Sequence, residues 1–75
     1  MSPAEAISIL TVAVDRAGAE TVQTPDLRAA LTMLVTRCED RSPLDRFWSG
    51  AGSPVAEDRR RILAASLREI RLQCP

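Results

Sequence analysis

Residues 24–40, TPDLRAALTMLVTRCED, decide the fold of this chain. At about 100° per residue, one side of a helix through this segment collects the apolar side chains. These are Leu27, Leu31, Leu34, Val35 and Cys38. Thr24 suits the N-cap, and Pro25 suits the first helical position because its missing N–H loses no hydrogen bond there. The pattern therefore predicts a core-facing helix over residues 25–40.

The same dipeptide motif, a hydroxyl residue followed by proline, occurs at three other places: Ser2-Pro3, Ser42-Pro43 and Ser53-Pro54. Each predicts a helix start, because the hydroxyl can cap the first turn. Ser2 and Glu5 also have the spacing of a capping box. We therefore expect an all-α fold, a small three-to-four-helix bundle with three main helices and one short helix. The expected helices cover residues 3–17, 25–40, 43–48 and 54–72 of a single domain, 1–75.

Glycines indicate where these helices end. Gly18 is a plausible C-terminal stop for the first helix, and Ser49–Gly52 has the composition of a flexible linker. Val22 precedes the Thr24 cap and is expected to tuck against the next helix. Helical spacing also predicts the core faces of the first and last helices. They consist of Ile7, Leu10, Ala13, Val14 and Ala17, and of Val55, Ile62, Leu63, Leu67 and Ile70.

Charge and hydropathy restrict the environment and the partners. Ten arginines balance ten acidic residues, which argues against bulk nucleic acid or an anionic membrane as the main partner. The chain lacks the roughly 20-residue apolar run of a membrane span and a basic N-terminal leader, so we expect a cytoplasmic protein. In that environment we expect Cys38 to be a reduced thiol in the core, and a Cys38–Cys74 disulfide is the alternative.

The residue inventory argues against catalysis. The chain has no histidine, lysine or tyrosine, so the usual general base, imidazole ligand and Schiff-base amine are missing. Two cysteines without histidine cannot complete a four-ligand zinc site. Ser49–Ser53 contains glycines but not the Gly-Lys-Ser/Thr pattern of a phosphate loop. We therefore expect no enzyme activity, metal, cofactor or small-molecule substrate.

Residues that disobey the amphipathic pattern are the candidates for function. Ile9 and Val12 project away from the apolar face of the first helix, so they either face a second neighbour or form a partner surface. Phe47 and Trp48, the only aromatic residues, either plug one end of the bundle or anchor a partner.

Arginines of the last helix form the other candidate set. Arg59 lies by angle on the apolar side, so it either reaches water at the end of the bundle, stacks on Trp48 or grips an acidic group of a partner. Four further arginines suggest a phosphate-contacting stripe or simply a solvated surface. They are Arg60, Arg61, Arg68 and Arg71.

These features support three hypotheses for function. The leading one is a non-enzymatic helical module that binds a larger protein or itself, including as a homodimer, and so serves as adaptor, inhibitor or regulator. The second is a small nucleic-acid-binding regulator that uses the arginines of the last helix. The third is a structural subunit of a larger assembly, whose mark would be poor folding in isolation.

Overall fold

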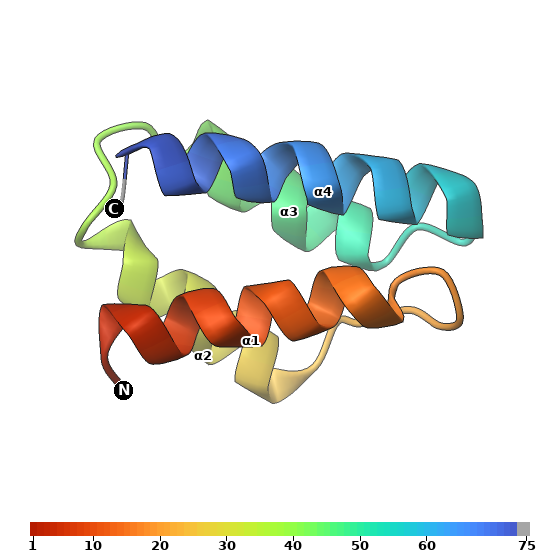
Figure 1. The fold of residues 1–75 in the computed structure, drawn as a ribbon, viewed down its shortest axis with the longest axis horizontal. Helices are drawn as coiled ribbons and strands as arrows, with labels where there is room; N and C mark the ends of the chain where they lie inside the picture. The colour runs from red at the N-terminus through yellow and green to blue at the C-terminus, as the bar shows by residue number, and fades with distance from the viewer. Residues whose placement is uncertain (74–75) are drawn as a thin grey trace.

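A computed structural model of the chain describes residues 1–73 and consists of four helices joined by short connections (Figure 1). The helices are α1 (Pro3–Arg16), α2 (Pro25–Val35), α3 (Ser42–Ala51) and α4 (Ala56–Gln73). No strand occurs in the described part of the chain. The predicted all-α helical bundle is therefore confirmed. Within residues 1–73, no helix has the length and apolarity needed to cross a membrane.

Two of the four predicted caps have the expected geometry. The Ser2 side chain accepts from the Glu5 N–H at 3.1 Å, and the Glu5 carboxylate accepts from the Ser2 N–H at 3.3 Å, which completes the capping box. The Thr24 hydroxyl accepts from the Leu27 N–H at 3.1 Å. α1 ends at Arg16 with Ala17 as C-cap, so Gly18 follows the helix as expected, although its φ is not positive.

The other two caps differ from the prediction. α3 begins at Ser42 itself, its N-cap is Arg41, and no side chain within residues 1–73 caps the helix; the Asp40 carboxylate accepts from the Ser42 N–H at 2.9 Å. The backbone and side chain of Ser42 both hydrogen-bond this carboxylate, and this lowers the pKa of Asp40 below its ordinary value of 3.8. Ser53 and Pro54 form a turn ahead of α4, which starts at Ala56.

Two helix lengths also differ from the prediction. α2 ends at Val35 rather than at residue 40. Near this end, the hydroxyls of Thr32 and Thr36 donate to backbone carbonyls of the preceding turn, which competes with regular helix hydrogen bonding. α3 continues through Ala51, so the predicted linker is helical. Within this segment, a Cβ at Gly50 would overlap Ile62 Cγ2 and approach Leu63 Cδ1 to 3.1 Å. This glycine permits close packing of α3 on α4 and is not a flexible hinge.

Successive helices run in opposite directions, and the bundle is made of two antiparallel pairs (Figure 1). α1 packs chiefly on α2, and α3 packs chiefly on α4. The connection between α1 and α2 is fastened to the end of α3, because the Val22 N–H donates to the Ala51 carbonyl and the Gln23 amide donates to the Trp48 carbonyl. Val22 is buried, as predicted.

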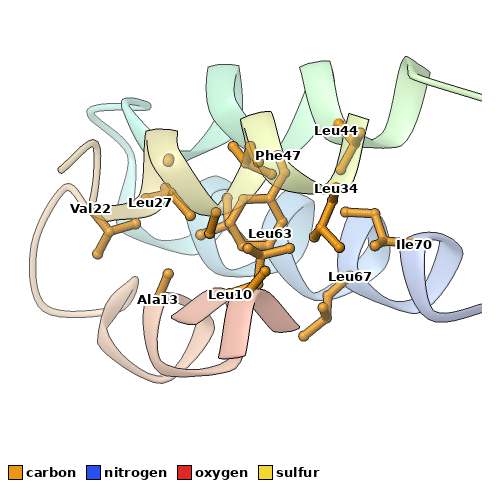
Figure 2. Close-up of a cluster of buried hydrophobic side chains, with 14 of the residues drawn as sticks. Leu10, Ala13, Val22, Leu27, Leu34, Leu44, Phe47, Leu63, Leu67 and Ile70 are labelled. Atoms are coloured by element: carbon orange, nitrogen blue, oxygen red, sulfur yellow. The ribbon is translucent and has the colours of Figure 1, made fainter. Parts of the chain in front are cut away.

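The core is aliphatic with one aromatic ring at its centre. Figure 2 shows Phe47 in the middle of the cluster, among leucines from the other three helices. Val55 was predicted to be in the core but is half exposed, because it precedes the first residue of α4 and the helical phase does not extend to it. Ile7, Val14 and Ile62 are only partly buried. The buried apolar residues are Ala6, Leu10, Ala13, Ala17, Val22, Leu27, Ala30, Leu31, Leu34, Cys38, Leu44, Phe47, Ala51, Leu63, Leu67 and Ile70.

Cys38 is not the reduced thiol that the sequence suggested. It is buried and takes part in a disulfide. Cys74, its predicted alternative partner, lies outside the described residues. The end of α4 is held near Cys38 by a reciprocal pair of hydrogen bonds: the Asp40 N–H donates to the Gln73 side-chain oxygen at 2.9 Å, and the Gln73 amide donates to the Asp40 carbonyl at 2.8 Å.

Candidate functional site

An apolar hollow that involves two predicted site residues, Ile9 and Val12, lies between α1 and the start of α2. We call it the α1–α2 groove. Its volume is about 300 Å³, and most of its lining surface is apolar. It is lined by Ser8, Ile9, Val12, Ala13, Arg16, Glu20, Thr21, Val22, Thr24, Asp26 and Leu27. The volume is at the lower limit of ordinary ligand pockets, about 300–1,000 Å³.

Ile9 and Val12 occupy different depths of this groove. Ile9 is partly buried and packs against the core, whereas Val12 is 52% exposed. The structure thus brings both predicted residues into one groove, with Val12 at its open side. Arg16 and Glu20 form an exposed ion pair at the rim, 3.7 Å apart, and Asp26 lines the side formed by α2. An exposed pair of this kind adds little stability, so it does not hold the groove closed.

Trp48 lies on the other side of α2, in a shallower hollow of about 210 Å³ between α2 and α3. The guanidinium carbon of Arg28 is 5.9 Å from the centre of its ring, within the range of a cation–π contact. Arg41 and Asp45 line the same hollow. Trp48 is partly buried, so one part of its ring packs on the bundle while another part stays accessible.

Phe47 and Trp48, adjacent in sequence, have different environments. Phe47 is fully buried at the centre of the core (Figure 2), whereas Trp48 borders the surface. Consecutive helical residues point about 100° apart, which is why one side chain enters the bundle while the other borders the surface. Only Trp48 of the predicted aromatic pair contributes to an accessible surface.

Arg59 is 4% exposed, so the prediction that it reaches water is wrong. The predicted stacking on Trp48 is also wrong, because Arg28 occupies that position. The Nε of Arg59 donates to the Ala17 carbonyl at 2.5 Å, and an Nη donates to the Ser53 carbonyl at 2.6 Å. Ala17 is the C-cap of α1, where unpaired carbonyls carry partial negative charge. The guanidinium therefore joins the end of α1 to the turn before α4.

The four arginines predicted as a stripe border one depression between α1 and α4, which we call the α1–α4 trough. It comprises two hollows, of about 480 and 380 Å³, that share Val14 and Ala64. Its residues are Val14, Asp15, Glu57, Arg60, Arg61, Ala64, Leu67, Arg68, Arg71 and Leu72. Although three consecutive arginine side chains point in three directions, Arg60 and Arg61 both line this trough while Arg59 is buried.

The apolar floor of the α1–α4 trough was not predicted as a site. Val14 and Leu67 were expected in the core, and Ala64 and Leu72 were not singled out. The signal in the sequence was the spacing along α4, since Glu57, Arg61, Ala64, Arg68 and Arg71 are separated alternately by four and three residues and share one helix face.

No group of three potential metal ligands occurs within residues 1–73. No protein-family model matches the chain, and no curated protein or solved structure is significantly similar to it.

Proposed function

We propose that this chain is a non-enzymatic module that binds another protein, either a larger target or a second copy of itself, through the α1–α2 groove. The observation that supports the proposal is the exposure of Val12 beside a mainly apolar hollow that also receives Ile9, Val22 and Leu27. Grouped apolar residues at an open surface are typical of interaction sites. A partner would insert an apolar side chain there and cover Val12.

Trp48 supplies a second anchor in this proposal. Tryptophan and arginine are enriched among residues that dominate binding energy, and the Arg28–Trp48 pair presents both on one surface. The first turns of α2 separate Trp48 from the α1–α2 groove, so a partner that spans α2 reaches both. The proposal assigns adaptor, inhibitor or regulator roles to this surface.

The experiment is a pull-down from lysate of the source cells, with nuclease present, that compares the wild-type bait with Val12→Asp and Trp48→Ala. Val12→Asp is preferred to a change at Ile9 because Val12 is exposed and Ile9 packs on the core. Ala65→Asp on α4 is the matched control, since Ala65 is exposed and lines none of the three depressions.

A stoichiometric protein band that Val12→Asp and Trp48→Ala weaken, and that Ala65→Asp retains, supports the proposal. If only the bait is recovered, sedimentation of the wild-type protein and of Val12→Asp tests self-association. Equal association of all four proteins would show that the wrong surface has been chosen.

A nucleic-acid-binding regulator is the second candidate. What favours it is the gathering of Arg60, Arg61, Arg68 and Arg71 around one trough. It predicts binding that falls steeply with salt and is lost when these arginines are replaced by glutamine. Binding that is insensitive to salt would count against it. A structural subunit, the third candidate, would fold poorly in isolation.

Cytoplasm is the location that the sequence favours, and the disulfide at Cys38 is the observation against it. Disulfides persist mainly in oxidising compartments. Alkylation of free thiols in a denaturing lysis buffer, which exposes the buried Cys38, followed by mass measurement, distinguishes the two locations. A modified Cys38 would support a reducing cytoplasm, and an unmodified one an oxidising compartment.

A further inference from the structure

The α1–α4 trough has the shape of a site for one helix. From Glu57 to Leu72 the helix α4 rises about 22 Å, or about four turns. The two hollows share Val14 and Ala64, so they adjoin each other at the middle of the trough. Ala64 has the smallest side chain along this wall and marks the point where another backbone can approach most closely. In Figure 1, α1 and α4 run side by side, so the trough follows the direction of both helices.

The α1–α4 trough is mainly apolar at the end near Leu72 and mainly polar at the end near Glu57, and arginines line its α4 wall. Leu72 is 81% exposed, so apolar surface is left open. Within residues 1–73, Arg60 and Arg68 have no carboxylate at salt-bridge distance, whereas Arg61 pairs with Asp58. Arg71 reaches from α4 to α1, where it donates to the Thr11 hydroxyl at 3.1 Å. The lining includes four arginines and only two carboxylates, those of Asp15 and Glu57.

We propose that the α1–α4 trough binds an acidic amphipathic helix of a partner protein. This surface is separate from the α1–α2 groove, and the inference rests on the proposed function only in that its occupant is a protein. Arg61 and Arg68 lie seven residues apart, about 10 Å along the axis, so they match carboxylates two turns apart on the incoming helix. Its apolar stripe covers Val14, Ala64 and Leu72, the helix-in-groove mode of recognition.

The same residues fit a nucleic acid less well. Leu72 and Val14 would find no apolar counterpart on a phosphate backbone, whereas an amphipathic helix carries an apolar stripe. The trough also contains no aromatic side chain on which an unpaired base could stack.

The test uses an alanine-based peptide of about 15 residues, the length of α4 that borders the trough. Its leucines follow i, i+4, i+7 spacing, and glutamates seven residues apart flank them. Binding of the labelled peptide to the full chain is measured by fluorescence anisotropy. The expected result is saturable binding at moderate salt. A peptide with lysine in place of every glutamate is the charge control, and it is not expected to bind.

Matched variants locate the site. Ala64→Trp fills the centre of the trough from an exposed helix position. It is expected to lower the affinity for the acidic peptide at least about tenfold. Ala65→Trp, at the next and equally exposed position, is expected to leave affinity unchanged. Replacing both Arg61 and Arg68 with glutamine removes two exposed charge contacts and is expected to cost roughly tenfold. Arg37→Gln combined with Arg41→Gln is the control for loss of two positive charges elsewhere, because both side chains are exposed and lie outside the trough.

Several results would overturn the inference: no binding of the acidic peptide, equal binding of the lysine peptide, or unchanged affinity in Ala64→Trp. Tighter binding of short duplex DNA, or of phosphatidylserine vesicles, than of the acidic peptide would also overturn it and assign the trough to that ligand. Val12→Asp is expected to bind the peptide normally, so failure here and failure of the α1–α2 groove proposal remain separate results. Circular dichroism checks that each variant is folded.

Discussion

Arg59 is the one charged residue that the fold buries within residues 1–73. The Ala17 and Ser53 carbonyls, rather than a carboxylate, accept hydrogen bonds from its N–H groups. We expect Arg59→Met to lower the free energy of unfolding by about 2 kcal/mol, since two charge-assisted hydrogen bonds are lost and two carbonyls lose their donor.

Urea denaturation measures this cost, and Arg60→Met is the matched control. Arg60 is the next residue along α4 and is exposed, so its replacement is expected to change stability by about 0.5 kcal/mol or less. If both variants unfold at the wild-type urea concentration, the guanidinium contributes nothing to the joint between α1 and α4.

Asp40 gives the fold a dependence on acid pH. Its pKa is lowered chiefly by the hydrogen bonds from Ser42, so its carboxylate stabilises the folded state above the pKa of the unfolded chain. That contribution is lost as the pH falls through the lower, folded pKa. We expect wild type to melt at a higher temperature than Asp40→Asn near neutral pH, and the gap to close below pH 3.8. A gap that stays constant over this range would contradict the assignment.

At the scale of helices, the sequence predicts where apolar side chains lie better than where helices stop. The 3.6-residue pattern correctly predicted that Leu27, Leu31 and Leu34 are buried. Their spacing along the helix is enough to place them on one face, so no distant contact is needed for this prediction. α2 ends at Val35, and the chain beyond it makes contacts with residues distant in sequence, such as the hydrogen bonds between Asp40 and Gln73. No local pattern encodes these contacts.

Gly50 also shows that the sequence predicts helix ends poorly. Composition predicted a linker there, whereas the residue belongs to α3 and packs closely on α4. Alanine there would favour the helix by about 1 kcal/mol, but its Cβ would overlap the β-branched side chain of Ile62. We expect Gly50→Ala to lose about 1–2 kcal/mol net. Gly18→Ala is the control in thermal melts, since its Cβ meets only the side chain of Arg60, which is exposed and can move. Equal effects of the two changes would contradict the close-packing role.

Cys38, in the connection between α2 and α3, takes part in a disulfide. We expect a reducing agent to lower the free energy of unfolding by about 2–4 kcal/mol, because the reduced chain gains conformational freedom mainly when unfolded. Urea denaturation with and without the reductant measures the difference. Cys38→Ala is the control and should not respond to reductant. A wild-type protein that unfolds identically in both buffers would show that the bond adds no stability.

The candidate sites were predictable to different degrees. Val12 and Trp48 break their helical patterns and do reach accessible surfaces. Phe47 and Arg59 break similar patterns but are buried, because helical angle alone does not say whether a neighbouring helix or a backbone carbonyl lies opposite. The α1–α4 trough needed the spatial pairing of two helices distant in sequence, which the chain order does not reveal.

At the scale of the whole molecule, Phe47 tests whether this small bundle folds by itself. A domain of this length has a total stability of about 4–11 kcal/mol, and Phe47→Ala is expected to cost about 3–5 kcal/mol because it leaves a cavity at the centre of the core. We expect Phe47→Ala to be largely unfolded on mild warming, while Phe47→Leu and Trp48→Ala keep their helicity. Circular dichroism melts of the isolated chain measure this. If wild type itself lacks a cooperative transition, the structural-subunit hypothesis gains over a self-folding binding module. If Phe47→Ala melts like wild type, the ring is not the centre of the core, and its adjacency to Trp48 would again favour a joint role at the surface.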